Sequence, residues 1–460
     1  MNESIVETPA TGAVVVHALQ ESELGGFLEG RQAFLAAYAQ TSDFKAKAGQ
    51  ILIAPNTEGA IDRVLFGLGG SADPMALRAL AARLPAGDYR LAATPAGMSA
   101  DQAALAFALG AYRYGRYKQG GVGDHARLFV EGADVAEVRQ QAHACALARD
   151  MINTPANDMG PLQIETIARE IAHHHGAQIT VITGEGLLEA NYPAIHAVGR
   201  AAVEARAPRM IELQWGEADK PLVAIVGKGV VFDTGGLDIK PSAGMRLMKK
   251  DMGGAAHALA LGRMIMAAGL PVRVAILAPV VENAISGDAM RPGDVLNSRK
   301  GLTIEVGNTD AEGRLILADA LTRAGELSPA LTLDLATLTG AARAALGPEI
   351  PPYYTDDDVL AQQIQTASDQ TGDPLWRMPL WKPYADALDS DIADIKNDPD
   401  AWAQAGSVTA ALFLQRFAPA GPWAHFDIFA WNGRGRPGRP AGGEAQAIRA
   451  LYRLVRDRFS

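Results

Sequence analysis

From about residue 159 onward, short apolar runs alternate with longer stretches of helical periodicity. The runs predicted as strands are AQITVIT (177–183), PLVAIVGKGVVF (221–232), PVRVAILAPVV (271–281), LTIEV (302–306) and LTLDLATLTG (331–340). The stretches predicted as helices are 162–176, 253–269 and 316–325. Two of the runs, 221–232 and 271–281, are almost continuously apolar, which is typical of strands buried on both faces. The alternation therefore predicts an α/β domain with a mostly parallel, doubly wound sheet flanked by helices.

The first third of the chain follows a similar but less regular pattern. Residues 11–130 mix short apolar runs with Ala/Leu-rich helical stretches, which predicts a smaller α/β domain. A helix should then begin after Asp134 as N-cap and end near Asn153, because Pro155 disfavours helix in the residue before it. A chain of 460 residues is too long for one ordinary core. We expect an N-terminal α/β domain over 1–132, a linker helix over 133–158 and a catalytic domain over 159–460.

Composition narrows the classes of function. The net charge of −10 and the pI of about 5.5 disfavour general nucleic-acid binding. The chain has one cysteine, Cys145, so it forms no internal disulfide, which fits a reducing compartment. The N-terminus lacks the apolar segment of a signal peptide, and no apolar run approaches the roughly 18–20 residues that span a bilayer. We therefore expect a cytoplasmic protein with no membrane partner.

Charged side chains gather in loops beside the apolar runs. These residues are Lys228, Asp233, Lys240, Asp251, Asp310, Glu312 and Arg314. In doubly wound sheets, functional sites form beyond the carboxyl ends of strands. Four carboxylates in one pocket would repel one another unless cations neutralise them. The pattern favours two divalent cations, and oxygen-rich ligation suits Mn²⁺ or Mg²⁺ and admits Zn²⁺. From spacing alone, solvated charged loops remain the alternative.

The segment GNTDAEGRL (307–315) places acids and a base at alternate positions. In extended chain, residues two apart share a face, so Asp310, Glu312 and Arg314 would converge on one site. Gly307 and Gly313 are predicted to keep the segment out of helix, and the next helix to begin near Arg314.

Several other polar residues are expected to be structural. The three residues His173–His175 are adjacent on a predicted helix and cannot all face one ion, whereas cations favour a helix C-terminus. His257 and His425 are expected in packing. Lys249 and Lys250 are expected to be solvated.

Two long motifs carry a resemblance to a known family. GKGVVFDTGGLDIKPSAGMRLMKKDMGGAA (227–256) and NTDAEGRL (308–315) resemble the two signatures of the leucyl aminopeptidases, cytosolic peptidases with two metal ions. The resemblance extends over roughly 148–460. The family implies release of N-terminal residues from peptides, with a preference for Leu-like residues, and assembly as a homohexamer.

The resemblance also implies residue roles. Lys228, Asp233, Asp251, Asp310 and Glu312 would hold two divalent ions, Mn²⁺ or Zn²⁺ by preference, with Mg²⁺ and Co²⁺ also compatible. Lys228 would bind as a neutral amine, Lys240 would polarise the scissile carbonyl, and Arg314 would hold a bicarbonate ion as general base. The implied substrate-binding residues are Met248, Asn308, Thr337, Leu338 and Gly340.

This sequence departs from the family pattern in places. Asp238 adds a negative charge two residues before Lys240, where it could act on that lysine or face away. The stretches 397–408 and HFDIFAW (425–431) also differ, and the second is bulky enough to reshape the pocket rim. The alternatives are a narrow-specificity dinuclear dipeptidase and a non-catalytic, nucleic-acid-binding homologue, although the acidic charge balance argues against the second.

Overall fold

The computed structural model describes residues 4–29, 33–70, 73–121, 123–399 and 404–460. The chain forms two compact units, one of residues 1–146 with 432–441 and one of 147–431 with 442–460. Helix α5 (Val135–Asn153) carries the chain from the first unit into the second. As predicted, Asp134 caps this helix, because its Oδ1 accepts a hydrogen bond from the Glu137 amide at 3.0 Å.

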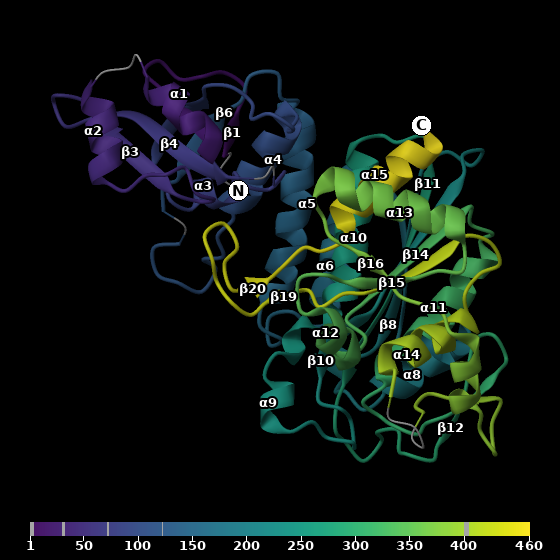
Figure 1. The fold of residues 1–460 in the computed structure, drawn as a ribbon. Helices are drawn as coiled ribbons and strands as arrows, with labels where there is room; N and C mark the ends of the chain where they lie inside the picture. Colours follow the sequence, from purple (N-terminus) through teal and green to yellow (C-terminus); the bar gives the residue numbers. More distant parts are fainter. Residues whose placement is uncertain (1–3, 30–32, 71–72, 122, 400–403) are drawn as a thin grey trace. The chain divides into compact units, whose positions relative to one another are not determined.

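The first unit is a small α/β domain, as the sequence predicts (Figure 1). Its six-stranded sheet has the order β1 (Ile5–Val6), β6 (Ala126–Phe129), β5 (Gly87–Leu91), β2 (Val14–Gln20), β4 (Ile61–Gly69) and β3 (Ile51–Pro55). Only β3 pairs antiparallel among these ladders. Its helical segments are η1 (Glu21–Glu23), α1 (Leu24–Leu28), α2 (Ala33–Thr41), α3 (Arg78–Ala81) and α4 (Ala100–Ala111).

The second unit is built on a nine-stranded sheet. Its order is β16 (Trp376–Arg377), β15 (Pro352–Tyr354), β18 (Trp423–Asp427), β14 (Leu331–Ala336), β9 (Leu222–Gly227), β11 (Arg273–Asn283), β8 (Arg209–Trp215) and β7 (Gln178–Thr183), with β10 (Gly229–Asp233) paired to β11. The central ladders between β18, β14, β9 and β11 are all parallel. Antiparallel pairs occur toward the edges, at β8 and at β15. The predicted mostly parallel sheet is confirmed.

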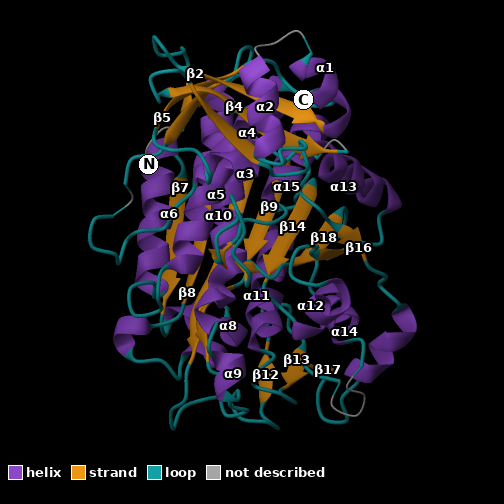
Figure 2. Cartoon of the chain, turned by 60° about the vertical axis from the view of Figure 1, so that its left-hand side comes forward, coloured by secondary structure: helices purple, strands orange, loops and turns teal. Residues whose placement is uncertain are grey.

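Short strands complete the structure, and helices cover the sheet of the second unit. The small ladders are β12 (Val295–Asn297), β13 (Thr303–Glu305) and β17 (Ile395–Lys396), and β19 (Trp431–Asn432) with β20 (Gly442–Gly443). The helical segments are α6 (Pro161–His175), α7 (Gly186–Glu189), α8 (Pro193–Gly199), η2 (Glu204–Arg206), α9 (Ser242–Met245), η3 (Met248–Met252), α10 (Gly253–Ala267), α11 (Glu312–Glu326), α12 (Gly340–Leu346), α13 (Asp358–Thr371), η4 (Lys382–Leu388), α14 (Gly406–Gln415) and α15 (Ile448–Phe459). Figure 2 shows the strands and helices from a second direction.

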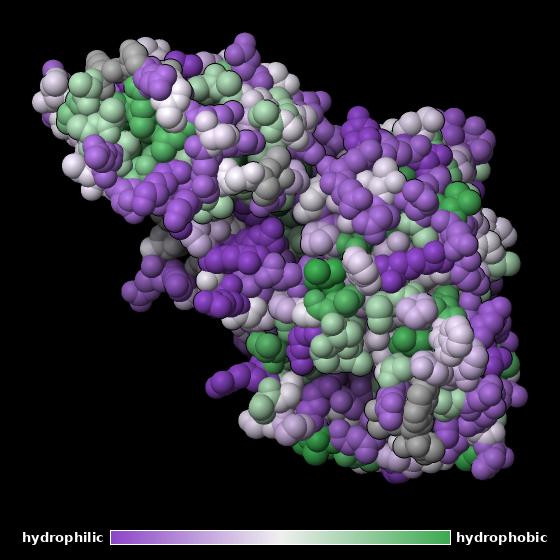
Figure 3. Space-filling view, viewed as in Figure 1, coloured by the Kyte–Doolittle hydropathy of each residue, from purple (hydrophilic) through white to green (hydrophobic). Residues whose placement is uncertain are grey.

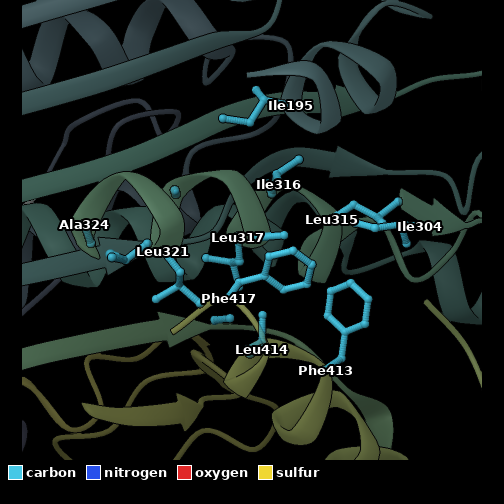
Figure 4. Packing of buried hydrophobic residues seen from close by; sticks show 14 of the residues in the cluster. Ile195, Ile304, Leu315, Ile316, Leu317, Leu321, Ala324, Phe413, Leu414 and Phe417 are labelled. Atoms are coloured by element: carbon cyan, nitrogen blue, oxygen red, sulfur yellow. The ribbon is translucent and has the colours of Figure 1, made fainter. Parts of the chain in front are cut away.

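Two helical layers sandwich the sheet because its central strands are apolar on both faces. Both α10 and α11 pack on β9 and β11, α10 together with α6 and α15, and α11 together with α8 and α14. Along β11 the faces alternate, as period-two side chains must. Ala275 and Leu277 join the cluster around α11, whereas Ile276 reaches Gly262 of α10. In Figure 4, Leu317 and Leu321 of α11 lie beside Leu414 and the ring of Phe417.

The structure corrects the sequence reading at two strands. The apolar run 221–232 is not one strand but two, β9 and β10, and Lys228 stands between them. The run LTIEV forms β13, which belongs to the three-stranded ladder with β12 and β17 rather than to the main sheet. Both differences arise from long-range pairing, which local hydrophobicity does not encode.

The surface is mostly polar with dispersed apolar residues. On the face that Figure 3 views, hydrophobic residues form small groups among hydrophilic ones. Within the described residues, no helix combines the length and apolar character required to cross a membrane.

Candidate active site

The charged residues singled out in the sequence come together beside one end of the central strands. Lys228 follows β9 and Asp233 ends β10, while Asp251 lies in η3 immediately before α10. Glu312 is the first residue of α11, and Thr337 comes directly after β14. Because parallel strands present their carboxyl ends at the same edge, segments far apart in sequence meet there.

Lys228 lies at the centre of one charged group. Its Nζ is 2.7 Å from Asp251 Oδ2 and 3.0 Å from Glu312 Oε1, and it donates to the Thr337 carbonyl at 3.1 Å. Asp251 Oδ1 also accepts from Thr337 Oγ1 at 2.8 Å. All these side chains are buried, so each contact is made with little solvent screening.

Lys240 lies at the centre of the second group. Its Nζ is 2.8 Å from Asp233 Oδ2 and also contacts Asp310 Oδ1. The other oxygen of Asp233 accepts from the Gly235 amide at 2.9 Å and from Asn283 Nδ2 at 2.8 Å. Asn283 is a site residue that the sequence reading missed. Its signal was a polar amide at the end of the long apolar run that forms β11.

Three carboxylates converge closely enough to share a cation. One oxygen each from Asp233, Asp310 and Glu312 lie within 4.8 Å of one another. Asp251 is outside this group of three but is tied to it through Lys228, which contacts both Asp251 and Glu312. Glu312 Oε2 is buried and accepts no hydrogen bond. A buried, unsatisfied carboxylate oxygen is costly for the protein alone and is what a metal ligand provides.

The pKa values reflect the same crowding. Burial, followed by repulsion from Asp233, raises the pKa of Glu312 to about 8. Burial and Asp233 likewise raise the pKa of Asp310 to about 6. For Lys228, burial acts to lower the pKa, but Asp251 and Glu312 outweigh it and raise the pKa. With the protein's own charges alone, Lys228 is therefore an ammonium. A neutral amine at this position requires added positive charge nearby.

The structure corrects the predicted conformation of GNTDAEGRL. Helix α11 begins at Glu312, not near Arg314, so Glu312 and Arg314 lie in its first turn and not on an extended strand. Residues two apart in a helix point in different directions. Glu312 accordingly joins the acidic group, whereas Arg314 contacts a separate segment, donating from Nη1 to the Asn397 carbonyl at 2.6 Å.

Gly313 has a steric role in place of the predicted helix-breaking one. A Cβ at this position would lie 2.5 Å from Lys228 Cε and 2.7 Å from Lys228 Nζ. The lysine cannot retreat easily because Asp251, Glu312 and the Thr337 carbonyl hold its ammonium. Gly313 therefore makes room for Lys228 beside α11.

Replacing Gly313 by Ala is expected to displace Lys228, lower activity by about 10- to 100-fold and destabilise the fold by about 1–3 kcal/mol, the usual range for overpacking. Gly307→Ala is the matched control, because its added Cβ would meet no atom closer than 3.5 Å, at Asp398 Cβ. Kinetics and thermal unfolding of both variants provide the measurement. Equal behaviour of the two would contradict this role.

Arg314 is a buried cation with spare donor capacity. Its Nε is buried without a hydrogen-bond partner, and no described carboxylate forms an ion pair with it. The side chain also borders the pocket described below. It is therefore placed to bind an anion.

A pocket of about 490 Å³ opens beside these groups. Its walls include all five residues that the resemblance assigns to substrate, namely Met248, Asn308, Thr337, Leu338 and Gly340. They also include Phe429 of the bulky stretch 425–431, and Lys250. The expectation that Lys250 is solvated is wrong, because its side chain is buried and its Nζ lies 3.3 Å from Asp251 Oδ1.

Asp238 binds Thr309 and so joins two loops to each other. Its amide donates to Thr309 Oγ1 at 2.9 Å, and the Thr309 amide donates to Asp238 Oδ2 at 2.8 Å. The bend that allows this contact uses Gly235, at φ +89°, where a Cβ would lie 2.4 Å from the Asp238 carbonyl. Of the divergent stretch 397–408, residues 400–403 lie outside the described part of the chain.

His257 and His425 are buried beside other elements, and His173–His175 lie at a helix end. His257 is buried, with Nδ1 2.6 Å from the Gly253 carbonyl and Nε2 accepting from the Gln446 amide at 3.0 Å. His425 is buried, with Nδ1 2.5 Å from Asp334 Oδ1. His173–His175 form the last turn of α6, ahead of Gly176, which ends the helix at φ 66° as predicted.

Comparison with known proteins agrees with this geometry. Residues 146–452 match the catalytic domain of the cytosol aminopeptidase family, and residues 14–131 match the M17 aminopeptidase N-terminal domain. The chain is 40% identical over 459 residues to a probable cytosol aminopeptidase of Syntrophotalea carbinolica, with 91% of each chain covered. The fold and the matches define a metallo-aminopeptidase, a hydrolase of peptides.

Solved structures lead to the same family. The cytosol aminopeptidase of Coxiella burnetii superposes with a TM-score of 0.93 at 43% identity, covering 99% of this chain and 100% of that one. The bottromycin maturation enzyme BotP, in complex with Mn, has a TM-score of 0.87 at 36% identity, with 97% and 99% covered. The chain belongs to the cytosol aminopeptidase family, M17.

Proposed function

We propose that this aminopeptidase works with two divalent cations held by Asp233, Asp310 and Glu312, together with Lys228 and Asp251. Two observations carry the proposal: one oxygen each from three carboxylates lie within 4.8 Å of one another, and Glu312 Oε2 is buried without a donor. Mn²⁺ has precedent in BotP, and Zn²⁺, Mg²⁺ and Co²⁺ also suit these ligands. When bound, such cations activate an attacking water and polarise the scissile carbonyl.

The chain's own residues position the peptide and its charges. Lys240 would donate a hydrogen bond to the carbonyl oxygen as negative charge develops there. Asn308 and Leu338 would contact the peptide backbone. Met248, Thr337 and Gly340 would line the site for the first side chain, and the apolar Met248 supports the expected acceptance of Leu-like residues.

Arg314 would hold a bicarbonate ion as the proton acceptor for the attacking water. Its free Nε and the absence of a described carboxylate partner support this role. A bound bicarbonate would provide the base, since a guanidinium does not accept a proton at neutral pH. Lys228 would become a neutral ligand, because positive charge nearby lowers the pKa of its amine.

The wider biology follows from the same assignment. We infer that the substrates are short peptides, that the protein acts in the cytoplasm like the cytosol aminopeptidases it resembles, and that it assembles as a homohexamer. No nucleic-acid partner is proposed, because the net charge is −10.

The function is tested by comparing rates on aminoacyl arylamides, on dipeptides and on N-acetylated peptides after loading with Mn²⁺. The proposal predicts hydrolysis of the first two groups and no hydrolysis of the acetylated group. Hydrolysis of dipeptides alone would instead support the narrow dipeptidase. Salt-sensitive nucleic-acid binding without any peptidase activity would support the non-catalytic alternative.

Chelation should make the stability of the protein fall as the pH rises from about 5 to about 8. The pKa values of Glu312 and Asp310, at about 8 and about 6, exceed the ordinary values of 4.5 and 3.8. In this window the folded state holds more protons than the unfolded state, so raising the pH favours unfolding. The raised pKa of Lys228 also stabilises the folded state, but this contribution is constant between pH 5 and pH 8. It is lost only when the pH rises above 10.5, the ordinary pKa of a lysine.

With Mn²⁺ bound, the carboxylates of Asp310 and Glu312 should stay ionised between pH 5 and pH 8. The fall in stability over this pH range should then be smaller. Thermal melts at pH 5.5 and pH 8, with and without chelator, measure the difference. A metal-dependent gain in Tm that is identical at both pH values would contradict the account.

A further inference from the structure

Asp427 is a buried acid at the end of β18 that has no part in the chemistry proposed above. Strand β18 pairs with β14, and Asp427 is in register with Ala336, the last residue of β14. At this end of the ladder the Ile428 amide donates to the Ala336 carbonyl at 2.8 Å. The chain then leaves β14 as the segment 337–340, whose backbone amides need other acceptors.

The carboxylate of Asp427 provides these acceptors. Its Oδ1 accepts from the Leu338 amide at 3.0 Å and from the Thr339 amide at 3.1 Å. Its Oδ2 accepts from Thr339 Oγ1 at 2.6 Å. Thr339 Oγ1 in turn accepts from the Ala342 amide at 3.0 Å and so caps α12, which begins at Gly340. One side chain therefore fixes both the segment and the start of the helix that follows it.

The two halves of the segment 337–340 are held by different groups. The first half is fastened to the charged site, because the Thr337 carbonyl accepts from Lys228 and its Oγ1 bonds to Asp251. The second half lines the pocket and is held by the three hydrogen bonds to Asp427. Loss of the Asp427 carboxylate should therefore release the pocket wall and leave the charged site in place.

We propose that Asp427 is a positioning residue for the substrate, which holds the segment 337–340 in the shape that binds the first residue of the peptide. A binding wall is precise only when supporting hydrogen bonds lock its geometry. This wall would contact the peptide equally before and during reaction, and losing such binding raises KM with little change in kcat. The inference rests on the proposed function, which assigns Thr337, Leu338 and Gly340 to the substrate.

The test measures KM and kcat for Leu-arylamide, together with bound Mn²⁺ and Tm, in the Mn²⁺-loaded wild type and variants. D427A removes all three acceptor contacts and should raise KM by about tenfold or more, with kcat within about threefold of the wild type. Inhibition by free leucine, which binds without reacting, should weaken by the same factor. Bound Mn²⁺ should be unchanged, because Asp427 is not among the proposed ligands.

D427N tests for rescue by a conservative change. Its side-chain oxygen can still accept from the Leu338 and Thr339 amides, whereas its nitrogen cannot accept from Thr339 Oγ1. D427N should therefore raise KM by only about threefold, between the values for the wild type and D427A.

D334N is the matched control. Asp334 is equally buried on the neighbouring strand β14, but it contacts Trp423 Nε1 at 2.7 Å and His425 Nδ1 at 2.5 Å, away from the segment 337–340. This variant should lower Tm and keep the KM of the wild type. If D427A does not fold, D427N compared with D334N carries the same test.

Three results would overturn the proposal. The first is a lower Tm or kcat in D427A and D427N with KM unchanged, which a purely structural role would give. The second is a KM in D334N raised as much as in D427N, and the third is loss of Mn²⁺ from D427A in proportion to its activity. A wild-type enzyme that does not hydrolyse Leu-arylamide with Mn²⁺ would instead overturn the proposed function, and the inference with it.

Discussion

Replacing Glu312 by Gln is expected to lower kcat/KM by about a thousandfold or more, equivalent to about 4 kcal/mol in transition-state stabilisation. Glu312 is buried at the start of α11, and its Oε2 has no donor in the protein. A neutral amide of the same shape cannot supply the negative charge that cations require. The variant should therefore also retain less metal after dialysis, measured by elemental analysis of the purified protein.

The same substitution should leave the fold intact, and without metal it should stabilise the protein at pH 8. Glu312 is destabilising when ionised, as its raised pKa indicates, and Gln removes that penalty. Glu326→Gln, at the other end of α11, is the control and should keep its metal and activity, because Glu326 pairs with Arg299 and Arg323 on the surface. An E312Q enzyme with full activity would refute the assignment.

Replacing Lys240 by Met should lower kcat by about 10²–10³-fold, the loss typical of one donor that stabilises an oxyanion. The lysine lies against Asp233 and Asp310 at the pocket wall, with no other role assigned to its ammonium. KM should change much less than kcat, because this hydrogen bond strengthens mainly in the transition state.

Metal content separates this effect from that of Glu312. K240M should keep its bound metal, since the oxygen ligands remain, whereas E312Q should lose it. Steady-state kinetics and elemental analysis on the same preparations make the comparison. A K240M enzyme that loses its metal in proportion to its activity would show that Lys240 organises the carboxylates and does not act on the substrate.

Local patterns in the sequence were enough to predict several of the long elements of the second unit. The apolar runs became β7, β9, β11 and β14, and the amphipathic stretches became α6, α10 and α11. These elements depend on side-chain periodicity and on capping groups close in sequence, as Gly176 illustrates. The loops that carry the charged residues could be located for the same reason.

Features set by contacts between distant segments could not be predicted. Helix α11 starts at Glu312, where Lys228 closely approaches Gly313. These two residues are 85 positions apart in the sequence. Lys250 looked like a surface residue because its neighbours in sequence are charged. Lys250 is buried because η3 packs against β10. Its Nζ contacts Asp251 and the face of the Phe429 ring. Asn283 belongs to no recognisable motif in the sequence. Its role depends on β11, which places its amide next to Asp233.

The central claim is that two cations, held by these carboxylates and Lys228, are needed for peptide hydrolysis. Its most direct test is to strip the protein with chelator and add Mn²⁺ in steps while measuring bound metal and Leu-arylamide hydrolysis together. The account predicts an inactive stripped protein, with activity that rises as binding approaches two ions per chain and that E312Q fails to regain. Full activity in the stripped protein, which has no bound metal, would contradict this claim.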